Sequence, residues 1–329
     1  MSFADELYDP MVEPGAVSQV PASAAAGMRD ADWEVDPLWT AQSGDRLEGE
    51  RVRLRFKGNP RGRRILVLGG ISAGRRVTSC DDGWWGELVG PQRAVCCDRD
   101  LIIGADYLPE HGGQAKRLRP EDFANLFLKA LRDEGVEELG AVIGASFGGM
   151  VALAMARLAP ARIGRLAVVC AAHRPHPMAT AVRHIQRQIL ELTEGTNREA
   201  EGVGLARQLA MTTYRSAEEF GSRFGPGGED LEAYLKHHGD RYASTVSAAR
   251  YRTLSAAIDA HSEDPSLIKV PTTVIAAEGD QLVPLELAQE LAARLPKLDR
   301  YEVIPTRYGH DAFLKETAAI APILKGMLS

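Results

Sequence analysis

The sequence predicts an α/β protein with a mostly parallel central sheet and helices on both of its faces. Two observations support this fold class. Apolar segments of strand length alternate with segments of helical periodicity along much of the chain, and residues 139–156 have the pattern of a buried strand, a sharp turn and a helix in direct succession. Parallel strands need such crossovers, because each connection must return the chain to the same end of the sheet.

The individual elements follow from their apolar patterns. Segments with the alternation or the continuous apolar run of a strand lie at 51–56, 64–68, 100–106, 166–172, 271–277 and 301–305. Segments with helical periodicity, besides the one that follows Ser146, lie at 120–133, 285–295 and 312–328. Pro120 suits the first turn of its helix, where the missing N–H is not needed.

The middle of the chain interrupts this alternation with helices alone. Segments with amphipathic or buried helical periodicity lie at 179–192, 201–211, 230–237 and 243–260. We therefore expect a core of residues 41–172 and 267–329, with a helical lid inserted at 173–266. Residues 1–40 mix proline, alanine, glycine and acidic residues without a period, and we expect them to be weakly ordered.

Composition and charge restrict the classes of function. The 329 residues carry a formal net charge of −6 and scattered basic residues, which disfavours nucleic-acid binding. The sequence has no apolar stretch of membrane-spanning length, and its N-terminus lacks a signal-peptide core. The cysteines match neither a disulfide framework nor a metal-binding spacing, and the adjacent His237 and His238 face different directions on a helix. We expect a cytoplasmic protein with no membrane association and no bound metal.

The most informative segment carries Ser146 between a strand and a helix. Residues 144–148 (Gly-Ala-Ser-Phe-Gly) match the pattern G-x-S-x-G, in which a serine lies at the tip of a strand-to-helix turn. Small flanking residues allow the strained backbone of this turn, and the helix directs its positive end towards the serine. The pattern is the nucleophile elbow of α/β-hydrolase enzymes, so Ser146 is the expected nucleophile. The alternative is a serine that caps the helix.

A second match to the same pattern surrounds Ser72. It also follows a strand, but residues 75–83 are polar and turn-rich and have no helical period. We therefore interpret Ser72 as a loop residue. Its loop is expected to supply one oxyanion donor, the backbone N–H of Ile71, while the N–H of Phe147 supplies the other.

Two residues nearer the C-terminus complete a triad in the chain order serine, acid, histidine. Asp280 directly follows the strand expected at 271–277, which places its carboxylate at the carboxyl edge of the sheet. A helix-capping role for Asp280, and Glu278 as the acid, are the alternatives. His310 is the histidine that follows Asp280 in the chain. We expect His310 to take the proton of Ser146, and Asp280 to orient the imidazole.

Four segments together resemble the homoserine O-acyltransferase family of the α/β-hydrolase fold. They are the Gly-Trp-Trp block at 83–91, the elbow at 144–150, the segment 206–220 and the Gly-His-Asp-Ala-Phe-Leu sequence at 309–314. The resemblance implies transfer of an acyl group from acyl-CoA, a co-substrate, to the γ-hydroxyl of L-homoserine in methionine biosynthesis. It further implies an acyl-enzyme on the serine, no bound cofactor, and a homodimer.

The same resemblance assigns residues to the acceptor. Arg207 is similar to the family's clamp for the α-carboxylate, where a bidentate guanidinium fits well. Tyr214 is similar to its hydrogen-bonding companion, and Asp311 to the anchor of the α-ammonium group. The alternatives are a solvated helix arginine for Arg207 and a first-turn helix acid for Asp311.

One departure from the acetyltransferases concerns the acyl donor. The oxyanion loop continues through Arg75 and Arg76, and is similar to that of short family members that use succinyl-CoA. Either arginine could pair with the free carboxylate of a succinyl group; the alternative is a solvent-facing pair. Succinyl-CoA is therefore slightly preferred over acetyl-CoA. A serine O-acyltransferase, an esterase with the same triad, and a catalytically silent binding protein remain open alternatives.

Overall fold

A mixed sheet of eight strands forms the centre of the structure. The computed structural model describes residues 27–109, 114–225, 228 and 230–329. In this part of the chain, the strands lie in the order β1 (Met28–Glu34), β2 (Arg51–Gly58), β6 (Leu101–Ala105), β3 (Arg64–Leu68), β7 (Ala141–Ala145), β8 (Leu166–Val169), β9 (Thr272–Ala277) and β10 (Leu298–Ile304). β2 is antiparallel to β1 and β6, and all neighbours from β6 to β10 are parallel. The predicted α/β class is confirmed.

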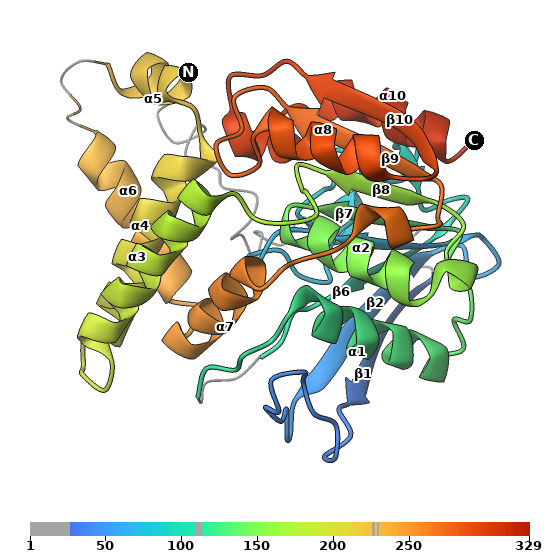
Figure 1. Ribbon diagram of the computed structural model, residues 1–329, viewed down its shortest axis with the longest axis horizontal. Coiled ribbons are helices and arrows are strands. Elements are labelled where there is room, and N and C mark those ends of the chain that lie inside the picture. Colours follow the sequence, from blue (N-terminus) through green and yellow to red (C-terminus); the bar gives the residue numbers. More distant parts are fainter. Residues whose placement is uncertain (1–26, 110–113, 226–227, 229) are drawn as a thin grey trace.

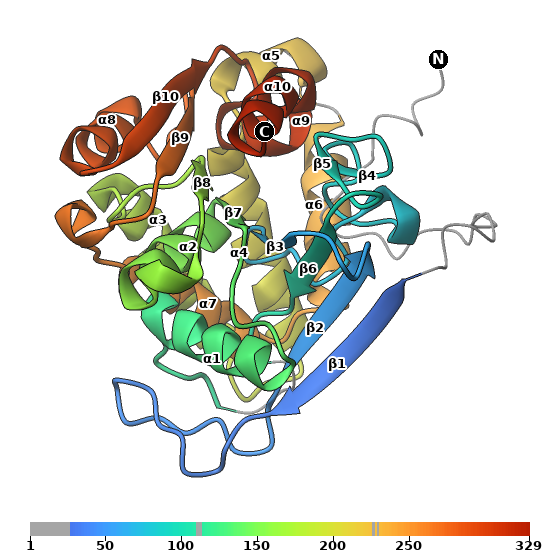
Figure 2. The same cartoon turned by 90° about the vertical axis from the view of Figure 1, so that its right-hand side faces the viewer.

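The central strands are apolar on both faces, and helices cover each face. Along β3, Leu66 and Leu68 belong to one core, and Ile65 and Val67 to the other. The first core is covered by α1 (Pro120–Asp133), α2 (Phe147–Leu158) and α8 (Leu285–Arg294). The second core is covered by α9 (Ala312–Lys315), α10 (Thr317–Met327) and the segment 84–97, which contains β4 (Val89–Gly90) and β5 (Val95–Cys96). Figure 2 shows α1 and α2 on one side of the sheet and α10 on the other. Burial on both faces explains the continuous apolar runs of these strands.

Between β8 and β9 the chain leaves the sheet and forms a helical insertion. Its helices are α3 (Pro177–Thr193), α4 (Glu199–Tyr214), α5 (Ala217–Phe224), α6 (Leu231–Ala243) and α7 (Ala248–Asp259). Figure 1 shows α3, α4 and α6 together at one end of the sheet. The insertion lies in the range 173–266, where the sequence predicts a lid, but α5 was not expected. None of the described helices combines the length and apolarity needed to cross a membrane.

One strand lies in the N-terminal segment that was expected to be weakly ordered. β1 pairs with β2 along its whole length, and Asp30 lies 2.7 Å from Arg55 across the pair. The strand is at the sheet edge and mostly exposed, so its stability comes from backbone pairing and ion pairs rather than from an apolar face. The expectation for residues 1–40 was therefore wrong at 28–34. Residues 1–26 lie outside the described part of the chain.

Candidate active site

Ser146 occupies a sharp turn between β7 and α2, with a backbone conformation that non-glycine residues rarely adopt. Its φ is 53° and its ψ is −122°. The turn requires glycine on both sides. A Cβ on Gly144 would lie 2.3 Å from the carbonyl oxygen of Gly148, and a Cβ on Gly148 would lie 2.3 Å from the carbonyl oxygen of Leu68. The turn thus has the geometry of a nucleophile elbow, and it presents Ser146 at the end of the strand.

The side chains of Ser146, His310 and Asp280 form one hydrogen-bonded series. Ser146 Oγ lies 2.8 Å from His310 Nε2, and His310 Nδ1 lies 2.7 Å from Asp280 Oδ2. The three residues follow the ends of three strands, β7, β10 and β9. Because these strands are parallel, their carboxyl ends meet at one edge of the sheet. The structure therefore brings together three side chains that are far apart in the sequence.

The carboxylate of Asp280 is buried, and both of its oxygens make hydrogen bonds. Its Oδ1 accepts hydrogen bonds from the backbone N–H groups of Leu282 and Val283, each at 2.9 Å. These donors fix the position of the carboxylate, while its Oδ2 lies 2.7 Å from Nδ1 of His310. Glu278, the alternative acid, is exposed. Asp280 thus organises the turn before α8 and orients the imidazole with the same group.

The environment of His310 raises its pKa above the ordinary histidine value. Burial opposes the charged imidazolium, but the charge and hydrogen bond of Asp280, together with the charge of Asp311, outweigh this effect; Arg183 acts in the opposite direction. The site therefore favours the imidazolium that forms when a base accepts a proton. This suits a residue that takes a proton from Ser146 and later returns it.

The expected oxyanion donors lie on the same cavity as the serine. Phe147 is the first residue of α2, and Ile71 follows β3; both line the cavity that contains Ser146. The first N–H groups of a helix have no acceptor within that helix, so the N–H of Phe147 can serve a ligand. Ser72 also lines this cavity, and its buried Oγ has no hydrogen-bond partner among the described residues.

The cavity lies between the sheet and the helical insertion. Residues that three helices of the insertion contribute to its wall are Ala179, Val182, Arg183 and Gln186 of α3, Arg207, Met211, Thr213 and Tyr214 of α4, and Tyr251, Ser255 and Ile258 of α7. Within each helix these positions are three or four residues apart or adjacent, so each helix presents one face to the cavity. The insertion therefore covers the side chains of Ser146 and His310.

Arg207, Tyr214 and Asp311 line this cavity together with Ser146. Arg207 is only 3% exposed, and its guanidinium carbon lies 5.2 Å from the ring centre of Tyr214. The ring of Tyr214 in turn lies 6.3 Å from that of His310. Burial raises the pKa of Tyr214, so its hydroxyl keeps the proton it can donate. The burial of Arg207 excludes the alternative of a solvated helix arginine.

Asp311 has a cationic neighbour that the sequence did not indicate. Arg215 Nε lies 3.1 Å from Asp311 Oδ2, and Arg215 Nη1 lies 3.6 Å from Glu219 Oε1. These contacts connect the end of α4 and the start of α5 to the turn that carries His310. No sequence signal predicts them, because the pairing depends on how the insertion docks on the core.

The structure does not bring Arg75 and Arg76 to the acyl site, and that prediction was wrong. Arg75 Nη1 lies 2.5 Å from Asp106 Oδ2, and Arg75 Nη2 lies 3.6 Å from Asp30 Oδ2. Arg76 is exposed. Neither arginine is among the described residues that line the cavity. The physical reason is that carboxylates on β1 and after β6 hold Arg75 at the outer edge of the sheet.

Two other arginines of the cavity wall were missed. Arg174 lies at the start of the insertion and pairs with Glu290 at 2.7 Å, whereas Arg183 is 9% exposed on the cavity face of α3. A signal for Arg183 was available, because it shares a helix face with Ala179 and Gln186. A charged residue on an otherwise buried face is a candidate for function.

The Gly-Trp-Trp block supports the loop of His310. The indole Nε1 of Trp85 donates a hydrogen bond to the carbonyl oxygen of Phe313 at 2.7 Å, and the rings of Trp84 and Trp85 stack with their centres 4.9 Å apart. Phe313 also lines the cavity. The block therefore holds the backbone that follows His310, rather than contributing a reacting group.

Known proteins with similar sequences support the same type of chemistry. A family model described as the alpha/beta hydrolase fold matches residues 99–317. The homoserine O-succinyltransferase of Xanthomonas campestris is 36% identical over 294 residues, which cover 85% of this chain and 80% of that protein. The homoserine O-acetyltransferase of Thermus thermophilus is 32% identical over 278 residues, which cover 75% of this chain and 72% of that protein.

Solved structures share the fold at lower identity. The homoserine O-acetyltransferase of Bacillus anthracis has a TM-score of 0.80 and 18% identity, over 92% of this chain and 98% of that one. Esterase E22 has a TM-score of 0.81 and 19% identity, over 92% of this chain and 100% of that one. The predicted α/β-hydrolase fold is confirmed, and since this fold carries both kinds of enzyme, function must be argued from the site.

Proposed function

Because this chain belongs to the homoserine O-acyltransferase family of the α/β-hydrolase fold, we propose that it transfers an acyl group from acyl-CoA to the γ-hydroxyl of L-homoserine. One observation carries the proposal: Ser146 and His310 share a cavity with Arg207 and Asp311. A nucleophile with its base suits acyl transfer, and a cation with a nearby acid suits the zwitterionic end of an amino acid.

In the first half-reaction, Ser146 Oγ attacks the carbonyl carbon of the thioester. His310 takes the hydroxyl proton as the C–O bond forms, and gives it to the sulfur as the C–S bond breaks, so that CoA leaves as a thiol. The N–H groups of Phe147 and Ile71 stabilise the negative oxygen of the intermediate. Asp280 stabilises the imidazolium. The acyl group is then an ester of Ser146.

In the second half-reaction, homoserine enters the same cavity. Arg207 and Tyr214 bind its α-carboxylate, and Asp311 lies near its α-ammonium group. His310 takes the γ-hydroxyl proton, the hydroxyl oxygen attacks the acyl carbon, and the proton passes to Ser146 Oγ as that ester bond breaks. Water is the competing nucleophile, and the insertion above the cavity limits its access.

Succinyl-CoA is the preferred donor in this proposal, and acetyl-CoA is the alternative. The preference is supported by the similarity to the homoserine O-succinyltransferase of Xanthomonas campestris, but acetyltransferases such as that of Thermus thermophilus are also similar. L-Serine is the alternative acceptor. It lacks one methylene, and a single methylene gives only about tenfold to two-hundredfold discrimination.

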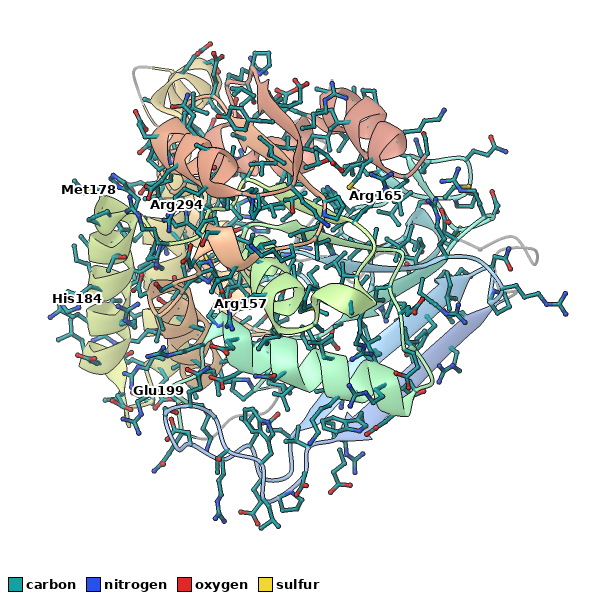
Figure 3. All side chains as sticks on the ribbon, turned by 45° about the vertical axis from the view of Figure 1, so that its right-hand side comes forward. Arg157, Arg165, Met178, His184, Glu199 and Arg294 are labelled. Carbon is teal, nitrogen blue, oxygen red and sulfur yellow. The ribbon has the colours of Figure 1, made fainter. Side chains whose placement is uncertain are left out.

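A homodimer through the helical insertion is a further part of the proposal. Apolar side chains on α3 at Met178, Ile185 and Leu192 are 66%, 49% and 83% exposed. They are seven residues apart, so they form one stripe on the helix. Figure 3 shows Met178 at the outer side of α3, away from the sheet. Exposed apolar stripes of this kind are typical of interfaces, and a two-fold axis would bury both copies.

Identification of the product tests the proposed activity. We expect the enzyme, supplied with L-homoserine and succinyl-CoA or acetyl-CoA, to form an O-acylhomoserine that mass spectrometry detects. Arg207→Gln should raise the KM for homoserine by about tenfold or more, because a charge-assisted contact is lost. Its acylation by the thioester should persist in the absence of acceptor. Appearance of the acyl group only as the free acid would contradict the proposal.

A further inference from the structure

Arg183 lies on the cavity face of α3, close to the reacting side chains. It lines the same cavity as Ser146 and His310 and is almost fully buried. Its charge is near enough to His310 to oppose protonation of the imidazole. The mechanism described above gives this arginine no role.

The charge of Arg183 is only partly compensated by the protein. Arg183 Nε donates to Asp259 Oδ1 at 2.7 Å, while Arg187 Nη1 lies 2.8 Å from Asp259 Oδ2. Two guanidinium groups thus share one carboxylate, which leaves one formal positive charge. Within the described part of the chain, no second acid lies within ion-pair distance of either arginine. Such a cation in a cavity wall favours an anionic ligand.

The guanidinium of Arg183 also keeps donors for a ligand. Its Nε is held by Asp259, and its Nη2 makes only a long contact of 3.4 Å to Thr180 Oγ1. The Asp259 contact fixes the side chain, so little conformational freedom is lost when an anion binds. A guanidinium with its terminal nitrogens available suits a carboxylate, which it can bind through two parallel hydrogen bonds.

We propose that Arg183 binds the free carboxylate of a dicarboxylic acyl group, and so makes the enzyme selective for succinyl-CoA over acetyl-CoA. This inference rests on the proposed function and specifies its acyl donor. Arg207 is assigned to the carboxylate of the acceptor, so a second cation in the cavity matches a second carboxylate. A succinyl group carries this carboxylate at the end of a short chain from the carbonyl that Ser146 attacks. An acetyl group ends in a methyl and leaves Arg183 without that partner.

The test compares Arg183→Gln with Arg187→Gln. Both variants remove one positive charge from the same cluster and leave Asp259 paired with the other arginine, but only Arg183 lines the cavity. We would measure acylation of the enzyme by each thioester without acceptor, as the initial release of CoA. We would then measure kcat/KM for each donor at saturating homoserine, and KM for homoserine at a saturating concentration of donor.

Arg183→Gln is expected to lower kcat/KM for succinyl-CoA by about tenfold to a hundredfold, the effect of one lost charge-assisted contact, and to change that for acetyl-CoA much less. Arg187→Gln should leave the ratio of the two donors unchanged. Arg183→Lys should retain part of the preference. An equal loss for both donors in Arg183→Gln would overturn the inference, as would an unchanged ratio with a raised KM for homoserine.

The wild-type enzyme separates failure of the inference from failure of the proposed function. Equal acylation of the wild-type enzyme by both thioesters would contradict only the inference about Arg183 and would leave the proposed function intact. Absence of acylation by either thioester contradicts the proposed function, and the inference with it.

Discussion

The protonation of His310 determines how the site responds to pH. In the proposed mechanism the residue acts as a base in its neutral form, so activity is expected above its pKa and should be lost as the pH falls through it. Burial opposes the imidazolium, but Asp280 and Asp311 raise the pKa above the ordinary value of 6.5. We therefore expect the acid limb of kcat/KM for the thioester to lie above that value. A limb well below it would contradict the electrostatic role of the two carboxylates.

The variant Asp280→Asn tests whether the carboxylate of Asp280 sets the pH of this acid limb. The substitution removes the main group that raises the pKa of His310 and disturbs the orientation of the imidazole. We expect kcat to fall by about 10³- to 10⁴-fold, as in other serine triads, and the acid limb to move to lower pH. Glu278→Gln is the matched control, since Glu278 is exposed. It should leave both the rate and the profile unchanged.

Individual residues differed in how far the sequence could place them. Ser146, Asp280 and His310 were predictable, because each follows a strand and parallel strands end at one edge. The positions of Arg75 and Arg183 relative to the cavity were not predictable. Arg75 is adjacent in sequence to the oxyanion loop, yet Asp106 holds it outside the cavity. Arg183 lies on an otherwise buried helix face, which makes it a candidate functional residue, but it reaches the site only through the docking of α3. Short-range patterns do not encode such tertiary contacts.

The helices and strands also differ in how well the sequence predicted them. Strands that are buried on both faces, such as β3 and β9, have continuous apolar runs and were predicted close to their observed bounds. β1 has an exposed, charged sequence, and its order depends on pairing with β2. α5 has eight residues and a single buried side chain, Glu219. β1 lacks the apolar alternation by which a strand is recognised. α5 has apolar residues at helical spacing, Ala217, Phe220 and Phe224, but it is only eight residues long.

The elbow between β7 and α2 should be intolerant of added volume. In Gly148→Ala the new Cβ would lie 2.3 Å from the backbone oxygen of Leu68, which cannot move without disturbing β3. We expect the free energy of unfolding in denaturant to fall by about 1–3 kcal/mol. Gly326→Ala in α10 is the control. It meets nothing within 4 Å, and should be neutral or stabilise by up to about 1 kcal/mol.

The Gly-Trp-Trp block should affect catalysis through the His310 loop. Trp85→Phe leaves the buried carbonyl of Phe313 without its donor, so we expect a loss of about 1–3 kcal/mol in unfolding free energy and a lower kcat. Trp33→Phe removes an indole hydrogen bond to Asp133 at the surface. That control should change stability less and leave kcat intact. Equal effects of the two variants would show that the block has no special connection to the site.

At the scale of the whole molecule, the site is formed jointly by the sheet and the helical insertion. The sheet positions Ser146, His310 and Asp280. The insertion, which lies at one end of the sheet (Figure 1), supplies Arg207, Tyr214 and other residues of the cavity wall. The sequence predicts both parts, because the helical stretch interrupts a regular alternation. It could not predict their relative placement, which depends on long-range contacts such as Arg215 with Asp311.

The proposed dimer makes its own prediction at this scale. Leu192→Glu places a charge on the apolar stripe of α3, and burial of an unpaired carboxylate is costly. We expect this variant to sediment as a monomer under conditions in which the wild type is a dimer. His184→Glu is the control, since His184 is exposed on the same helix but lies about 100° around the helix from Ile185. A wild-type monomer would contradict the proposed dimer.

The most direct measurement of the central claim is CoA release with and without L-homoserine. It would be followed with succinyl-CoA and with acetyl-CoA, and Ser146→Ala would be the control. After one equivalent per active site, release is expected to continue only when homoserine is present, and Ser146→Ala should lower the rate by about a thousandfold or more. Sustained release at the same rate without homoserine would mean that water is the acceptor, and the assignment as an acyltransferase would be contradicted.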